Sequence, residues 1–97
     1  MNENTLVSKA IQGNQDALTA LFTRYRRLLY SLAHGVLHNH DEAQDAVRGC
    51  LRSALSNLPT FKCEGSFRAW LVRLLINEAV SSLRKRKGAL TIASENS

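Results

Sequence analysis

The residues with the clearest potential for chemistry are an aromatic side chain, Phe61, and the lysine that follows it, Lys62, in a short segment of loop-forming residues at positions 59–66. An unstacked nucleic-acid base can stack on an aromatic ring while a neighbouring cation attracts the phosphate backbone. This pattern favours contact between Phe61, Lys62 and a single strand. The alternative is that Phe61 tucks into the hydrophobic core and touches no ligand.

The segment after this loop carries a polar, basic edge and a basic end. Its periodicity predicts a helix over residues 67–87, on which Arg73, Asn77 and Arg84 cluster within about 40°. The run Arg84-Lys85-Arg86-Lys87 closes this helix. Concentrated positive charge favours contact with nucleic acid, and the alternative for the run is a solvated surface.

No pattern in the chain is typical of an enzyme. Serine, histidine and aspartate occur at no spacing that predicts a nucleophile elbow or a triad, and there is no glycine-rich phosphate loop. His34 and His38 are spaced for a shared zinc ion, with His40 nearby. Because paired cysteines and the glutamate of a metallopeptidase helix are missing, we prefer ordinary surface or partly buried histidines. We predict no catalysis, no metal and no cofactor.

The net charge of +5 is concentrated in one third of the chain. Residues 1–58 hold six Lys and Arg against five Asp and Glu, whereas residues 59–88 hold seven against two. A fixed basic patch binds polyanions because it releases counterions from phosphate. A membrane surface would also attract it, so the sign of the charge alone does not choose the partner.

Composition and periodicity predict one all-α domain, a compact bundle of three to four helices. We expect four helices: from a cap at Asn4 or Thr5 to Gly13, from an Asn14 cap to about Leu37, from an Asp41 cap to Pro59, and from a Ser66 cap to Gly88. Core positions of the last helix are predicted at Phe67, Trp70, Leu71, Leu74 and Leu75. Leu51 and Leu55 are placed on the buried stripe of the third helix.

Compartment and oxidation state follow from what the sequence contains. No apolar run approaches the ~20 residues needed to span a bilayer, and the first residues are polar, so we expect a cytoplasmic protein. Cys50 lies in a helical apolar stripe, so we predict reduced or buried thiols for Cys50 and Cys63.

Four motifs in a fixed order resemble region 2 of sigma-70 family factors, in the extracytoplasmic-function group. They are Ala-Leu-x-x-Leu-Phe-x-x-Tyr at 17–25, Asp-Ala-Val at 45–47, Phe-Lys-x-x-x-x-Phe-x-x-Trp-Leu at 61–71, and Arg-Leu-x-x-Asn-Glu-Ala at 73–79 followed by Leu-Arg-Lys-Arg at 83–86. The resemblance covers residues 5 to about 87.

The resemblance implies a non-enzymatic transcription initiation factor. Such domains bind the clamp helices of the RNA polymerase β′ subunit and capture the non-template single strand of the promoter's minus-ten element. It implies polymerase contacts on the helix with the Asp45 motif, where Asp45, Arg48 and Arg52 share a polar stripe. It implies DNA contacts from the loop and the last helix; the residues we assign to them are Phe61, Lys62, Arg73, Asn77, Arg84, Lys85 and Arg86.

Four departures from the family fall on the docking helix. Arg48 and Gly49 stand where a glutamine and an acidic residue are usual, and Leu51 and Leu55 replace residues that are often aromatic. If the first two departures damage docking, Arg48→Gln with Gly49→Glu should restore it. Arg48 and Gly49 favour an alternative function, a sigma-like decoy that binds an anti-sigma factor or polymerase without melting promoters. An anti-sigma factor is a further expected partner in either case.

The resemblance predicts a domain over residues 1–87 and a linker or flexible tail over residues 88–97. Typical members carry a second, helix-turn-helix domain that reads the upstream promoter element. That domain is missing from this sequence, so we expect a fragment of a longer gene product.

Overall fold

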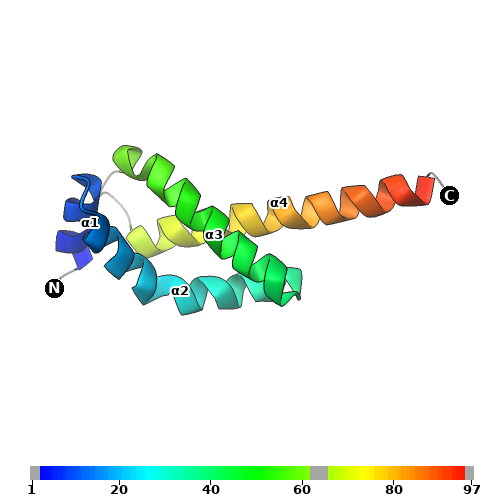
Figure 1. The fold of residues 1–97 in the computed structure, drawn as a ribbon, viewed down its shortest axis with the longest axis horizontal. Coiled ribbons are helices and arrows are strands. Elements are labelled where there is room, and N and C mark those ends of the chain that lie inside the picture. Colours follow the sequence, from blue (N-terminus) through cyan, green and yellow to red (C-terminus); the bar gives the residue numbers. More distant parts are fainter. Residues whose placement is uncertain (1–2, 62–65, 96–97) are drawn as a thin grey trace.

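The computed structural model describes residues 3–61 and 66–95, with side chains described as far as Lys87. It contains α1 (Glu3–Ile11), α2 (Gln15–Leu37), α3 (His40–Asn57), a 3₁₀ turn η1 (Leu58–Thr60) and α4 (Phe67–Glu95). The helices α2, α3 and α4 each pack against the other two, and α1 packs against α2 and η1 (Figure 1). No strand occurs in the described ranges, and the predicted all-α bundle is confirmed.

Leucines from α2 and α4 form the centre of the core. Leu21, Leu29, Leu71 and Leu75 are almost completely removed from solvent. Each such side chain contributes roughly 1.5–3 kcal/mol when it leaves water. The buried face of α3 is made of small residues: Ala43, Ala46, Gly49, Cys50 and Ala54. Small side chains allow α2 and α4 to lie close to α3 on both sides.

Two of the four predicted N-terminal caps are confirmed. The predicted cap at Asn4 or Thr5 is wrong, because both residues lie inside α1. The Asn14 side chain accepts a hydrogen bond of 3.0 Å from the backbone N–H of Ala17, and Ser66 Oγ accepts one of 3.2 Å from Ala69, as predicted. The predicted cap at Asp41 is wrong, because Asn39 has the extended backbone and accepts from the N–H of Glu42 at 2.9 Å. Asp41 instead lies in the first turn, where a carboxylate favours the helix dipole.

The last helix is longer than predicted. Its backbone continues through Gly88 to Glu95, so the prediction that Gly88 ends it is wrong. A helical glycine costs only about 1 kcal/mol relative to alanine, which does not stop a helix by itself. The C-terminal turns project well beyond α2 and α3, which gives the molecule a long axis of 56 Å against 23 and 21 Å (Figure 1). The assignment of residues 88–97 as a linker stays a prediction.

Two further predictions about the core need correction. Trp70 and Leu74 are half-buried rather than central, and both pack against the core from its edge. Leu55 is 49% exposed although its stripe is apolar. The segment after α3 also begins as the turn η1 and not as plain loop, and Leu58, the first residue of η1, is buried.

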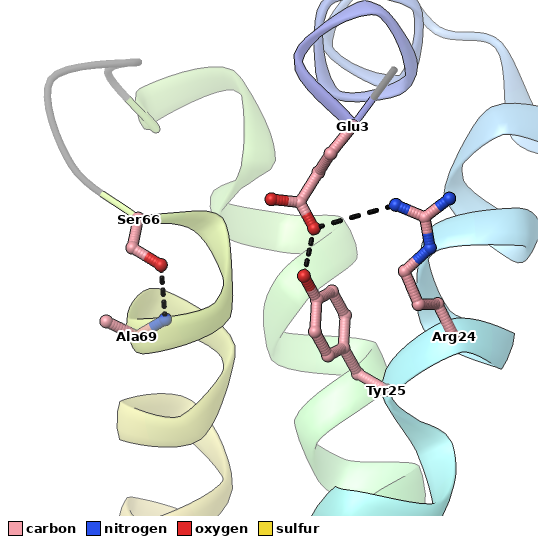
Figure 2. Close-up of polar contacts among 5 residues, drawn as sticks. All are labelled: Glu3, Arg24, Tyr25, Ser66 and Ala69. Carbon is pink, nitrogen blue, oxygen red and sulfur yellow. Dashed lines mark hydrogen bonds and ion pairs between the residues drawn. The ribbon is translucent and has the colours of Figure 1, made fainter. Parts of the chain in front are cut away.

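Polar contacts hold α1 onto α2. The Tyr25 hydroxyl of α2 donates a hydrogen bond to Glu3 of α1, and Arg24 pairs with the same carboxylate at 3.8 Å (Figure 2). Burial, followed by this hydrogen bond, raises the pKa of Tyr25, so its hydroxyl stays protonated and keeps donating. The ring of Tyr25 lies 6.3 Å from that of Phe67, at the start of α4.

The cysteine in the core is unreactive. Cys50 is free and buried, as predicted, and its thiol donates to the carbonyl of Leu71 at 3.6 Å. Burial, with the negative charge of Glu78 adding to it, raises the pKa of Cys50 to about 12. Thiols react as thiolates, so Cys50 is inert at neutral pH. Cys63 lies outside the described residues.

Candidate nucleic-acid interface

Three exposed side chains, Arg73, Asn77 and Arg84, lie on one side of α4. We call them the DNA-facing stripe after the ligand that the sequence predicts for them. Their spacing of four and seven residues returns them to the same side of the helix. Lys85 is also exposed, beside Arg84. The structure therefore places four of the predicted DNA-binding residues where a ligand could reach them, on one rigid helix.

Arg86 differs from its basic neighbours because its guanidinium turns inward. It donates a hydrogen bond of 3.0 Å to the carbonyl of Leu37, at the C-terminal end of α2, and forms an ion pair with Glu42 in the first turn of α3. A cation at this position interacts favourably with the negative, carbonyl end of the α2 dipole. Arg86 thus connects α4 to both helices at the α2–α3 turn through Nη2, and these contacts hold its guanidinium against the protein.

We expect Arg86→Ala to lower the free energy of unfolding by about 1 kcal/mol. The variant loses a charge-assisted hydrogen bond that solvent weakens only in part. In a domain of this size that corresponds to a drop in Tm of roughly 4–8 °C. Arg84→Ala is the matched control, since Arg84 has no hydrogen bond or ion pair among the described residues. Thermal unfolding followed by circular dichroism measures both, and equal Tm values would contradict the anchoring role.

Phe61 belongs to an aromatic cluster formed by Phe61, Phe67 and Trp70. Ring centroids lie 4.9 Å apart for Phe61 and Trp70, and 5.8 Å apart for Phe61 and Phe67. The backbone N–H of Phe61 donates to the carbonyl of Leu58 at 3.0 Å, which fixes its place after η1. Phe61 is half-buried and packs against the core, as the alternative interpretation expects in part, and its contact with a single strand stays a prediction. Lys62 lies outside the described residues.

The polar stripe of α3 faces solvent as predicted. Asp45, Arg48 and Arg52 are all exposed. Arg48 pairs with Asp45 at 3.4 Å, and both side chains are about 70% exposed. Pairs of this kind contribute little to stability. The stripe is therefore free to exchange its internal pair for contacts with a partner.

A groove of about 930 Å³ between α2 and α3 lies beside this stripe. Its apolar walls include Leu18, Phe22, Val47, Leu51 and Leu55, and its charged lining residues are Arg26, Arg27 and Arg48. Sequence reasoning missed this surface because it assigned Leu51 and Leu55 to the core. Two features of the sequence could have indicated this groove. Arg26 and Arg27 are adjacent cations on α2, and the apolar residues of α3 spread over two neighbouring parts of its surface.

The histidines form no metal centre in the described ranges. No group of three or more His, Cys, Asp or Glu side chains there could hold a metal ion. The Tyr30 hydroxyl and His40 Nδ1 are hydrogen-bonded at 2.7 Å, and the rings of Tyr30 and His34 lie 5.9 Å apart. His38 ends α2 with a left-handed backbone (φ 54°). These contacts give all three histidines roles in the α2–α3 turn.

Together these features define an all-helical domain with an exposed basic stripe beside an aromatic cluster, an arrangement typical of nucleic-acid-binding proteins. Residues 21–89 match the Sigma-70 region 2 family. The chain belongs to this family, in its extracytoplasmic-function group. Of the helices in the described part, none is long and apolar enough to cross a membrane.

Relatives with the same domain come from distant bacteria. The chain is 28% identical over 81 residues to the ECF RNA polymerase sigma factor SigW of Bacillus subtilis (strain 168), which covers 84% of this chain and 43% of SigW. It is 28% identical over 91 residues to the ECF sigma factor SigM of Mycobacterium tuberculosis (strain H37Rv), covering 94% of this chain and 46% of SigM. The chain thus spans less than half the length of these relatives.

A solved structure has the same fold along almost its whole length. It is the NMR structure of an engineered region 2 of sigmaE in complex with GTAAAA. The TM-score is 0.86 at 26% sequence identity, and the match covers 93% of this chain and 94% of the other.

Proposed function

We propose that this chain is the promoter-opening domain of a sigma factor, which binds core RNA polymerase and captures the non-template strand of the minus-ten element. The observation that carries the proposal is the DNA-facing stripe of α4 beside the aromatic cluster, on a fold shared with a region 2 solved with GTAAAA. Both the role and the site residues rest on this juxtaposition. The role requires no catalytic group and places the protein in the cytoplasm with the polymerase.

The proposed DNA contacts divide by chemistry. Phe61, with Lys62 after it, receives an unstacked base, because Phe61 packs on Trp70 yet stays partly exposed. Arg73, Arg84 and Lys85 meet phosphates, which positions the strand without reading sequence. Asn77 lies between the arginines of the stripe and reads a base edge, since an amide offers both a donor and an acceptor. Arg86 contributes less than these residues, because its Nη2 is already held by Leu37 and Glu42.

Fluorescence anisotropy with the labelled single strand GTAAAA tests the DNA role of the whole chain. We expect binding that weakens with added salt and that exceeds binding to the same sequence in duplex form, because an accessible ring can stack only on an unpaired base. We expect a modest affinity in the absence of polymerase, because in the complex the polymerase also holds the strand. Absent or salt-independent binding would refute the DNA role and favour the decoy function.

The proposed polymerase contacts lie on the exposed surface of α3 and on the groove beside it. The exposed stripe of Asp45, Arg48 and Arg52 docks on the β′ clamp helices, and the groove between α2 and α3 supplies apolar area next to it. Leu55 adds the one large apolar side chain that is exposed among the described residues. An anti-sigma factor that covered this surface would block docking.

Charge changes on this stripe should alter binding to a β′ clamp-helix fragment. We expect Asp45→Lys to weaken it, and Arg48→Gln to strengthen it by roughly two- to fivefold, because Arg48 occupies the Asp45 carboxylate with an exposed pair worth about 0.2–1 kcal/mol. Titration of the fragment at low and high salt measures both effects, since rim charges act mainly on association.

The expected benefit of Gly49→Glu is revised by the structure. Gly49 is buried against α4 and does not lie on the exposed stripe, so a glutamate there cannot restore a docking contact. Arg48→Gln alone is therefore the informative restoration. If neither wild type nor Arg48→Gln binds the clamp fragment while circular dichroism shows intact helices, the polymerase role is wrong for this chain.

A further inference from the structure

One polar contact lies inside the packed interface between α3 and α4. Gly49, in the middle of α3, is buried, and a Cβ atom placed on it would lie 2.5 Å from Oε2 and 2.8 Å from Cδ of Glu78. Real Cβ atoms do not approach other heavy atoms so closely. The Glu78 carboxylate therefore occupies the space directly over the Gly49 backbone, which any larger residue would fill.

The other oxygen of Glu78 is also engaged by α3. Oε1 accepts a hydrogen bond of 3.1 Å from Ser53 Oγ, one helical turn beyond Gly49. Glu78 itself is half-buried, and Ala79 beside it is fully buried. A carboxylate in such a place is costly unless its hydrogen bonds are made, so Ser53 and Gly49 together define one position for it.

This contact bears on DNA because of where Glu78 lies along α4. Asn77, in the DNA-facing stripe, is the residue before it, about 100° around the helix. A roll of α4 that moved Glu78 off Gly49 would move Asn77 and the two arginines with it. Apolar packing against the small residues of α3 is non-directional, whereas the hydrogen bond between Ser53 and Glu78 is directional and so favours one orientation of α4.

We infer that Glu78 is a positioning residue, which with Gly49 as its counterpart sets the rotation of the DNA-facing stripe relative to the polymerase-docking helix. The inference rests on the proposed DNA role of α4. It also explains two features that are unfavourable singly: a glycine in a helix interior and a glutamate on an apolar arc. The missing side chain of Gly49 leaves room for the Glu78 carboxylate, and the carboxylate fills the space that the glycine leaves open.

Thermal unfolding of the whole chain tests the pair with a matched glycine as control. Gly35 of α2 is helical and exposed, and a Cβ there would meet nothing within 4 Å. Gly35→Ala should therefore raise Tm by about 4–8 °C through helix propensity alone. Gly49→Ala should raise it less or lower it, because Glu78 must leave Ser53. With Glu78→Ala also present, Gly49→Ala should raise Tm as much as the control does.

Binding of labelled GTAAAA tests the positioning role, because a contact that only stabilises the fold would leave the affinity for DNA unchanged. Gly49→Ala should weaken binding by about three- to tenfold at temperatures where the domain stays folded. In the Asn77→Ala background the same change should cost less, because the contact that it misplaces is already gone. Glu78→Ala should weaken binding too, and adding Gly49→Ala to it should cost nothing more.

The outcomes separate this inference from the proposed function. If wild type does not bind the oligonucleotide, the DNA role and the positioning role both fail, although the Tm comparison still reports on the contact. If wild type binds and Gly49→Ala binds equally well, the contact is structural only and the inference is overturned. It is also overturned if Gly49→Ala raises Tm as much as Gly35→Ala in the presence of Glu78.

Discussion

Phe61→Leu should lower the affinity of the chain for single-stranded GTAAAA by roughly 5- to 150-fold, because one base-stacking contact is worth about 1–3 kcal/mol. Leucine retains apolar volume against Phe67 and Trp70, the two rings that pack on Phe61. It removes the flat aromatic face on which a base can stack. Equilibrium anisotropy titrations of wild type and variant at one salt concentration measure the ratio.

The packing of Phe61 requires a control for stability, because aromatic pairs contribute about 0.5–1.5 kcal/mol beyond their buried area. Phe61→Tyr serves this purpose, because its ring can still pack on Phe67 and Trp70 and can still stack on a base. It therefore tests whether an aromatic ring at this position is sufficient for binding. We expect near wild-type binding from Phe61→Tyr. Equal affinity of Phe61→Leu and wild type, with both folded at the assay temperature, would exclude the base-stacking role.

Local signals in the sequence were sufficient for most of the fold. Asn14 and Ser66 were identified as caps because their short polar side chains precede apolar periodicity, and both accept the expected hydrogen bond. Asp41 was a wrong choice because Asn39 offers a side chain of the same kind two residues earlier. His38 takes a left-handed conformation, which lets Asn39 begin the next helix. When two residues that can cap a helix lie this close together, the sequence alone does not show at which of them the helix begins.

The candidate site was predictable in composition but not in contacts. Helical periodicity gave the exposed stripe of Arg73, Asn77 and Arg84, because four-residue spacing depends on one helix only. It could not distinguish Arg86 from Arg84, since the partners of Arg86 are Leu37 and Glu42, more than forty residues away along the chain. Contacts between helices depend on their relative rotation, which no single helix encodes.

The exposure of Leu55 and the pairing of Gly49 with Glu78 have the same origin. A wheel places Leu55 on the apolar side of α3, yet 49% of its surface remains exposed beside the groove between α2 and α3. The wheel likewise gives Glu78 no partner, although Ser53 and Gly49 receive it. Periodicity predicts which side of a helix is apolar but not which part of that side a neighbour covers.

The dependence of DNA binding on salt should separate the outward cations of α4 from the inward one. Replacing Arg73, Arg84 and Lys85 together by glutamine should reduce the slope of log affinity against log salt by about 2, because each phosphate contact to a single strand contributes roughly 0.7. Glutamine keeps the helix propensity of these exposed positions. Anisotropy titrations of GTAAAA at several salt concentrations give the slope.

Two charge-matched variants make this prediction strict. Arg52→Gln removes one charge from the exposed stripe of α3 and should leave the slope unchanged, whereas Arg84→Gln, which removes one charge from α4, should lower it by roughly 0.7, because only direct phosphate contacts release counterions. Arg86→Gln should lower Tm with little change in slope, since its guanidinium is held by Leu37 and Glu42. A slope that falls equally for Arg52→Gln and for each cation of α4 would mean that the chain attracts DNA through its net charge alone. The DNA-facing stripe would then have no specific role, and the orientation of α4 set by Glu78 would have no consequence for binding.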